Sequence, residues 1–137
     1  MKLGYLKDTG DAERMALQKE AVERAGAKKL FVDRAETPKA IRPHLRRLKQ
    51  EMAEGDTVII QSLPCLGRNI RDLLDQLKAL KEKGVALVSL EEGIDTTTEA
   101  GAAVLPILNS LLHFDRNMSN FWNPETPARE NKTILDG

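Results

Sequence analysis

Short apolar runs alternate along the chain with longer segments in which apolar residues recur every three or four positions. The short runs have the length and the branched side chains that are typical of buried strands, and they lie at 2–6, 30–32, 57–60 and 85–90. Three of the longer segments end at a glycine, namely Gly26, Gly55 and Gly84, as helices commonly do. The alternation predicts an α/β fold, with a mostly parallel sheet of four to five strands flanked by helices.

The last apolar-periodic segment predicts a long C-terminal helix. It begins at Thr98 and runs through Met118 to the neighbourhood of Trp122. Pro106 lies early in this segment, where a first helical turn tolerates proline, whereas a deeper position would kink the helix. We expect Asp95 and the threonines that follow it to form the turn that caps the helix.

The length of 137 residues allows one ordinary domain. We expect that domain at 1–122 and an irregular tail at 123–137, which contains two prolines and mostly polar side chains. From this tail we expect no helix-turn-helix domain. No apolar run approaches the ~20 residues that span a bilayer, and the first residues lack the apolar stretch of a signal peptide, so we expect a cytoplasmic protein without membrane contact.

The charges balance over the whole chain, with 21 basic and 21 acidic residues. This balance argues against a protein held to nucleic acid by bulk charge alone. A local patch is nevertheless present, because no acidic residue occurs between 37 and 50. Its basic residues are Lys39, Arg42, Arg46, Arg47 and Lys49. The patch is either a solvated helix face or an edge that contacts phosphates.

The residues that commonly bind metals are few. One cysteine, Cys65, cannot form an internal disulfide, and with two histidines it cannot complete a structural zinc site. No histidine lies near Cys65 in the sequence, which favours an inert thiol over a nucleophile. His44 and His113 are isolated, so we expect no metal and no cofactor.

Several motifs occur in an order and spacing that resemble the amino-terminal catalytic domain of serine recombinases, the resolvase and DNA-invertase family. They are Gly4-Tyr5, Leu17-Gln18, Arg42-Pro43, Gly55-Asp56-Thr57, Leu66-Gly67-Arg68, Arg71-Asp72-Leu73, the run from Glu92 to Thr98, and Phe114-Asp115-Arg116. The resemblance covers roughly 1–120 and implies the resolvase catalytic-domain fold. Each motif alone is weak, and the run that begins at Glu92 is the longest.

The resemblance implies a defined chemistry. Members of the family cut DNA with a serine hydroxyl that attacks a backbone phosphate, while arginines balance the charge on that phosphate and no metal is needed. The resemblance places Thr9 at the nucleophile position and assigns further catalytic positions to Lys7, Gln18, Arg42 and Arg68. We expect further phosphate or DNA contacts, from Lys39, Arg46, Arg47 and Arg116.

The sequence departs from the family pattern at several of these positions. Lys7 and Cys65 stand where the family has arginines, and Pro64 replaces an aspartate. Asp8 brings a carboxylate next to the expected phosphate, and Glu36-Thr37 replaces Ser-Gly. Loss of one preorganised donor commonly costs about 10²–10³ in rate. The departures therefore predict impaired strand cleavage.

Three functions remain open at this point. The first is a DNA-associated accessory or regulatory protein with impaired cleavage, which forms a homodimer through 98–122, because that helix carries more apolar residues than one core-facing stripe needs. The second is a protein–protein interaction module without a nucleic-acid role. The third is an active recombinase that uses Thr9 as its nucleophile, although the hydroxyl of Thr9 is also suited to the capping region of the first helix.

Overall fold

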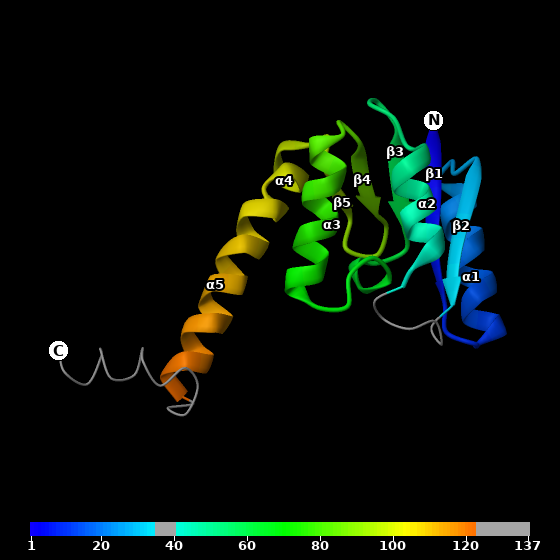
Figure 1. Cartoon of the computed structure of the whole chain (residues 1–137). Helices are drawn as coiled ribbons and strands as arrows, with labels where there is room; N and C mark the ends of the chain where they lie inside the picture. Colours follow the sequence, from blue (N-terminus) through cyan, green and yellow to red (C-terminus); the bar gives the residue numbers. More distant parts are fainter. Residues whose placement is uncertain (35–40, 123–137) are drawn as a thin grey trace, which may run out of the picture.

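A five-stranded sheet lies at the centre of the computed structural model, which describes residues 1–34 and 41–122 (Figure 1). The strands are β1 (Lys2–Asp8), β2 (Lys29–Arg34), β3 (Thr57–Ile60), β4 (Ala86–Ser89) and β5 (Ile94–Asp95), in the spatial order β2-β1-β3-β4-β5. The first four are parallel, and β5 pairs antiparallel with β4. The structure therefore confirms the mostly parallel sheet predicted from the sequence.

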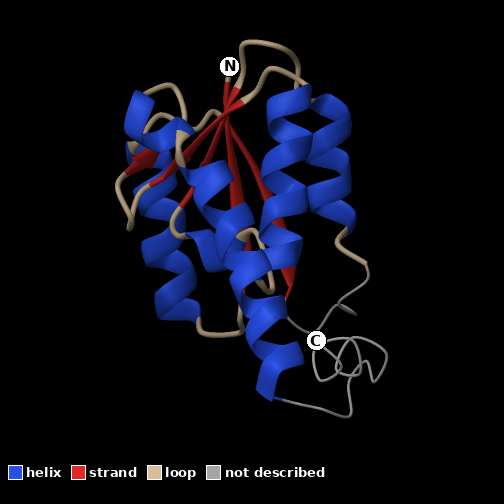
Figure 2. Ribbon diagram, turned by 90° about the vertical axis from the view of Figure 1, so that its left-hand side faces the viewer, coloured by secondary structure: helices blue, strands red, loops and turns tan. Residues whose placement is uncertain are grey.

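Helices cover both faces of this sheet (Figure 2). The helices are α1 (Ala12–Arg24), α2 (Pro43–Glu51), the short 3₁₀ helix η1 (Leu63–Cys65), α3 (Ile70–Glu82), α4 (Glu99–Ala102) and α5 (Val104–Trp122). One apolar cluster joins α2 and α3 to the sheet through Leu45, Leu48 and Leu77, and a second joins α1 to the opposite face through Val22. This arrangement explains why the strands are short, nearly continuous apolar runs: a strand covered by helices on both faces has few positions that face water.

The first strand shows how the chain fills both layers. Leu3 and Tyr5 belong to the cluster under α2 and α3, whereas Leu6 belongs to the cluster under α1. All three side chains are buried. Successive side chains of a strand point to opposite faces, so β1 places apolar groups in both layers.

The expected long C-terminal helix is present as α5, but it begins at Val104, and the residues just after Thr98 form the separate short helix α4. The first piece, α4, is capped by Thr98, whose hydroxyl accepts a hydrogen bond of 3.0 Å from the Gly101 amide. The division falls at Ala103, between the two helices. Pro106 has no N–H to donate to the carbonyl four residues earlier, and regular bonding resumes with the amide of Ile107, which donates to Ala103 at 3.2 Å.

The long helix α5 leaves the rest of the structure after its first turns (Figure 1). Val104, Leu105 and Leu108 pack against the cluster of α2 and α3, and no residue of α5 is fully buried. None of the helices in the described ranges combines the length and the apolarity needed to cross a membrane. The expected tail at 123–137 and the residues at 35–40 lie outside the described residues.

Candidate active site

A surface hollow of about 520 Å³ lies at the carboxyl ends of β1 and β3. This edge of a parallel sheet is where ligands commonly bind in α/β folds. The residues that line the hollow include Lys7, Thr9, Gln18 and Cys65 from the sequence prediction, together with Arg14 from α1. The structure thus brings three of the five predicted catalytic residues to one place.

The turn that carries Thr9 is shaped by its neighbours. The Asp8 carboxylate accepts a hydrogen bond of 2.9 Å from the Gly10 amide, and Gly10 has a φ of +92°, which favours glycine. Asp11 caps α1, because its side chain accepts hydrogen bonds from the amides of Glu13 and Arg14. Asp11 therefore supplies the cap, and Thr9 is left as an exposed hydroxyl at the rim of the hollow.

Gln18 joins α1 to the end of β1. Its Oε1 accepts a hydrogen bond of 2.8 Å from the Lys7 amide, and its Nε2 donates one of 3.0 Å to the Lys7 carbonyl. The pairing of β1 with β3 ends at Gly4, so Gln18 supplies the polar partners for Lys7 beyond that point. Gln18 is buried, and its amide is committed to the backbone.

Cys65 lies beside this glutamine. Its Sγ is 3.5 Å from Gln18 Oε1 and 3.5 Å from Ser62 Oγ. A thiol in this position adds no positive charge to the hollow, where the resemblance calls for an arginine. The cations that line the hollow are Lys7 and Arg14, and an acidic residue, Glu91, belongs to the same lining.

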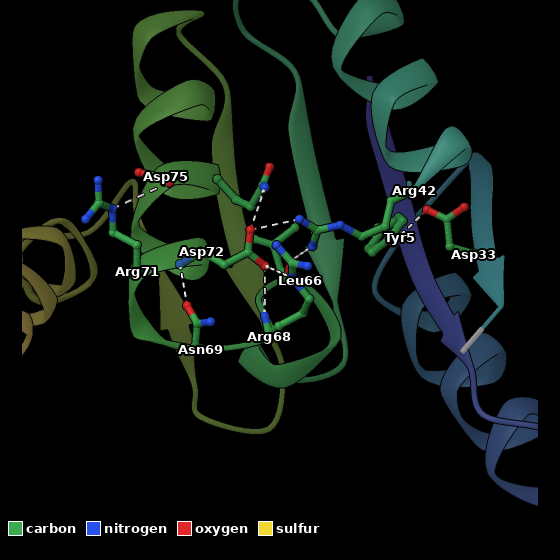
Figure 3. A network of polar contacts seen from close by, with 10 residues as sticks. Tyr5, Asp33, Arg42, Leu66, Arg68, Asn69, Arg71, Asp72 and Asp75 are labelled. Atoms are coloured by element: carbon green, nitrogen blue, oxygen red, sulfur yellow. Dashed lines mark hydrogen bonds and ion pairs between the residues drawn. The ribbon is translucent and has the colours of Figure 1, made fainter. Parts of the chain in front are cut away.

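The other two predicted catalytic residues, Arg42 and Arg68, meet at a different point, the carboxylate of Asp72 (Figure 3). Arg42 donates from Nη2 to Asp72 Oδ1 at 2.8 Å and from Nη1 to the Leu66 carbonyl at 2.9 Å. Arg68 donates to Asp72 Oδ2 from its backbone amide at 2.9 Å and from Nε at 3.3 Å. Neither arginine lines the hollow that Thr9 lines.

Asp72 is an ionised carboxylate in this network. Burial alone would raise its pKa, but the hydrogen bonds from Arg42, the Arg68 amide and Gln76 outweigh burial and hold the pKa well below its usual range. The Gln76 amide donates to Asp72 Oδ1 at 3.2 Å, and Asn69 caps α3 by accepting from the Asp72 amide at 2.8 Å. The charge on Asp72 therefore persists at neutral pH.

A second buried carboxylate, Asp33, fixes the start of α2. It accepts hydrogen bonds of 3.0 Å from the amides of His44 and Leu45, and one of 2.8 Å from the hydroxyl of Tyr5. Burial, reinforced by the hydrogen bond to Asp33, raises the pKa of Tyr5 far above its usual value. Arg42 is the residue immediately before α2. Because Asp33 holds the first amides of α2, it also fixes the position of the Arg42 backbone.

The sequence prediction assigned no role to Asp33 or Asp72. The spacing of four residues between Arg68 and Asp72 is an available signal, since it is the spacing of neighbours on a helix, although Arg68 itself lies just before the Asn69 cap of α3. No comparable signal marked Asp33, whose partners come from segments that are distant in the sequence. Within 1–34 and 41–122, no three side chains of the metal-binding types gather in one place.

Comparison with known proteins decides the family. The family model described as "Resolvase, N terminal domain" matches residues 7–121 of this chain. The chain belongs to the resolvase family. The match includes all five predicted catalytic residues, two of which are the arginines of the Asp72 network.

The relatives of this resolvase-family chain include enzymes named for DNA inversion and resolution. A DNA-invertase from Escherichia phage P1 is 32% identical over 118 residues, which cover 86% of this chain and 63% of that protein. The Transposon Tn552 resolvase from Staphylococcus aureus is 32% identical over 120 residues, which cover 86% of this chain and 61% of that protein. The chain thus spans less than two thirds of the length of these relatives.

Solved structures show the same fold. The N-terminal catalytic domain of TP901-1 integrase matches with a TM-score of 0.72 and 23% identity, covering 86% of this chain and 98% of that one. A resolvase family site-specific recombinase from Streptococcus pneumoniae matches with a TM-score of 0.73 and 17% identity, covering 96% and 97%. These likenesses confirm the resolvase catalytic-domain fold expected from the sequence.

The residues expected to contact DNA are dispersed in this resolvase-family chain. Arg46 and Arg47 are exposed on α2, and Arg47 Nε lies 3.1 Å from the carboxylate of Glu51. Arg116 is exposed on α5. Lys39 lies outside the described residues, as do Glu36 and Thr37.

Proposed function

We propose that this chain is a recombinase-type domain that is impaired in strand cleavage and associates with DNA as an accessory or regulatory protein. The observation that carries this proposal is the separation of the catalytic groups. Thr9 lines the hollow at the end of β1, whereas Arg42 and Arg68 are both bonded to Asp72 and do not line that hollow. A phosphate at Thr9 would therefore lack the guanidinium groups of Arg42 and Arg68, and with them part of the charge stabilisation that phosphoryl transfer needs.

The substitutions within the hollow support impairment independently. Lys7 offers a point charge rather than the planar fork that binds a phosphate through two parallel hydrogen bonds. Cys65 contacts Gln18 and Ser62 and offers no cation. Glu91 adds a negative charge to the same lining. The hollow therefore has fewer cationic donors than the family chemistry implies.

Association with DNA is supported by α2. Arg46 and Arg47 are exposed and no acidic residue occurs between 37 and 50, although Arg47 forms an ion pair of 3.1 Å with Glu51 at the end of α2. Basic residues on one exposed helix displace counterions from a phosphate backbone, so the affinity they supply falls as salt rises. Relatives named DNA-invertase and resolvase match most of this chain, which supports DNA as the partner.

We also propose a homodimer through 98–122. Five of the six exposed large apolar residues of α5, all except Trp122, recur at alternating steps of four and three, at Ile107, Leu111, Phe114, Met118 and Phe121. Steps of this kind place apolar side chains along one line of a helix, as in the seam between two paired helices. Each of these residues is at least 43% exposed in the single chain, so a second copy would cover a continuous apolar face.

Binding to duplex DNA at two salt concentrations tests the DNA association. We expect affinity that falls steeply between about 50 and 200 mM salt, and a double substitution Arg46→Glu and Arg47→Glu that removes most of it. The control is Arg24→Glu with Lys28→Glu, two exposed positions on and just after α1 that give the same change in net charge. Equal losses in both double variants would contradict a specific role for α2.

The alternative is a protein–protein interaction module. The balanced net charge and the exposed apolar face of α5 favour it. The same experiment separates the two functions, because an interaction module shows no salt-dependent affinity for DNA in the unmodified chain.

A further inference from the structure

The carboxylate of Asp72 occupies the point at which two guanidinium groups converge. It accepts hydrogen bonds from Arg42 Nη2 at 2.8 Å, from the Arg68 amide at 2.9 Å and from Arg68 Nε at 3.3 Å (Figure 3). Two guanidinium groups and a backbone amide around one oxyanion are the donors that proteins also use for phosphate. Asp72 thus fills a position in which a phosphate oxygen would find the same partners.

The two arginines differ in how firmly they are held. The Arg42 side chain is 13% exposed, and both of its terminal nitrogens donate to protein acceptors. The Arg68 side chain is 41% exposed and reaches Asp72 only through Nε at 3.3 Å. An incoming anion therefore meets Arg68 first, and must displace Asp72 before it reaches Arg42.

The net charge of Arg42, Arg68 and Asp72 together determines how strongly such an anion is attracted. Two cations share one ionised carboxylate, so the group carries one net positive charge while Asp72 is in place. The pKa of Asp72 lies well below its usual range, so Asp72 is not protonated near neutral pH and the arginines are not released in this way. Only a competing oxyanion, or loss of the charge by substitution, frees them.

We propose that Asp72 is a built-in competitor that keeps the anion affinity of Arg42 and Arg68 low, and that an oxyanion of the phosphate class binds this pair by displacing it. The phosphate is either a DNA backbone group or free inorganic phosphate. For the DNA source the inference rests on the proposed function, whereas for free phosphate it stands on the geometry alone.

Asp72→Asn tests the proposal, because it keeps the shape of the side chain and removes its charge. The matched control is Asp75→Asn, on the same helix, where the carboxylate is 60% exposed and lies 3.9 Å from Arg71. We expect Asp72→Asn to raise the affinity for inorganic phosphate by about fivefold or more, the effect of an added charge-assisted contact. Asp75→Asn, which changes the net charge equally, should raise it by less than about twofold.

A second substitution assigns any gain to the arginine pair. Adding Arg42→Gln to Asp72→Asn should return the phosphate affinity to that of the unmodified chain. The proposal is overturned if folded Asp72→Asn binds phosphate no more tightly than Asp75→Asn, or if the gain survives Arg42→Gln. Thermal unfolding establishes that each variant is folded.

A measurement on the unmodified chain covers the case in which Asp72→Asn does not fold. During a phosphate titration, the side-chain Nε–H resonances of Arg42 and Arg68 should move together in an NMR spectrum. Shifts confined to residues of the hollow, such as Lys7 and Thr9, would overturn the proposal.

Short duplex DNA, bound at several salt concentrations, separates this inference from the proposed function. If the unmodified chain binds no DNA but Asp72→Asn gains phosphate affinity, the DNA association fails and the competitor role stands. If DNA binds equally well to both single variants and phosphate affinity does not change, the competitor role fails and the DNA association stands.

Discussion

The hydroxyl of Tyr5 donates a hydrogen bond of 2.8 Å to Asp33, and both side chains are almost fully enclosed. Asp33 also accepts from the first amides of α2, so one carboxylate connects strand β1 to the helix that follows Arg42. Tyr5→Phe keeps the ring and removes the donor. We expect it to lower the free energy of unfolding by about 1–2 kcal/mol, measured by urea denaturation.

Asp33→Ala should cost more, about 3 kcal/mol, because three donors then lose their acceptor in a buried place. Leu17→Ala, at a side chain that is 56% exposed, is the control for generic truncation and should stay within about 0.5 kcal/mol. Equal stability of Tyr5→Phe and the unmodified chain would show that Asp33 is satisfied without Tyr5.

The Asp72 network predicts a dependence of stability on acid. The pKa of Asp72 is depressed in the folded state, so its contribution is present above the unfolded pKa of about 4 and is lost as pH falls below it. Asp72→Asn should therefore weaken the fall in stability between pH 5 and pH 2, both rough bounds of the window. Thermal unfolding across this range checks it, with Asp75→Asn as the control. A fall of the same steepness in both variants would contradict the network.

The backbone at Gly67 lies close to the backbone of α3 at Leu73, next to the Arg68–Asp72 contact. A Cβ atom added at Gly67 would lie 2.5 Å from Leu73 Cα, and neither backbone segment can yield at low cost. We expect Gly67→Ala to destabilise the fold by about 1–3 kcal/mol, as overpacking does. Ser62→Ala, in the same loop, adds no bulk and is the control. A Gly67→Ala chain as stable as Ser62→Ala would mean that the loop and α3 separate easily.

The apolar face of α5 predicts self-association. Leu111→Glu combined with Met118→Glu places two charges on the seam, so we expect a dimeric chain to become monomeric, as measured by analytical ultracentrifugation. Asn109→Glu adds a charge at an exposed position away from the seam and should leave the mass unchanged. If the unmodified chain is monomeric at micromolar concentration, the proposed homodimer is contradicted.

Much of the fold follows from local patterns, as two strands illustrate. The branched run at 57–60 is strand β3 with those bounds, and the run at 85–90 contains β4. The boundary between α4 and α5 could not be predicted in this way. It depends on which backbone hydrogen bonds form around Pro106, and the spacing of apolar residues does not reveal them. The strand β5 has two residues, too few for any alternation to mark it.

The site was harder to predict than the fold, because its geometry depends on contacts between distant segments. Motif order predicts one site for Thr9, Arg42 and Arg68, whereas the structure brings the two arginines together away from the hollow that Thr9 lines. It does so through Asp72, 30 residues from Arg42, whose role no local pattern indicated. Gln18 shows the same limit, since its bonds to the Lys7 backbone depend on how α1 packs on β1.

Covalent capture of DNA is the most direct test of impaired cleavage. The unmodified chain and Thr9→Ser are each incubated with a supercoiled plasmid, denatured, and analysed for DNA-linked protein, with Thr9→Ala as the blank. We predict no covalent product above the blank in either, because restoring the serine does not bring the guanidinium groups of Arg42 and Arg68 to the hollow. A covalent product from the unmodified chain that disappears in Thr9→Ala would contradict the account.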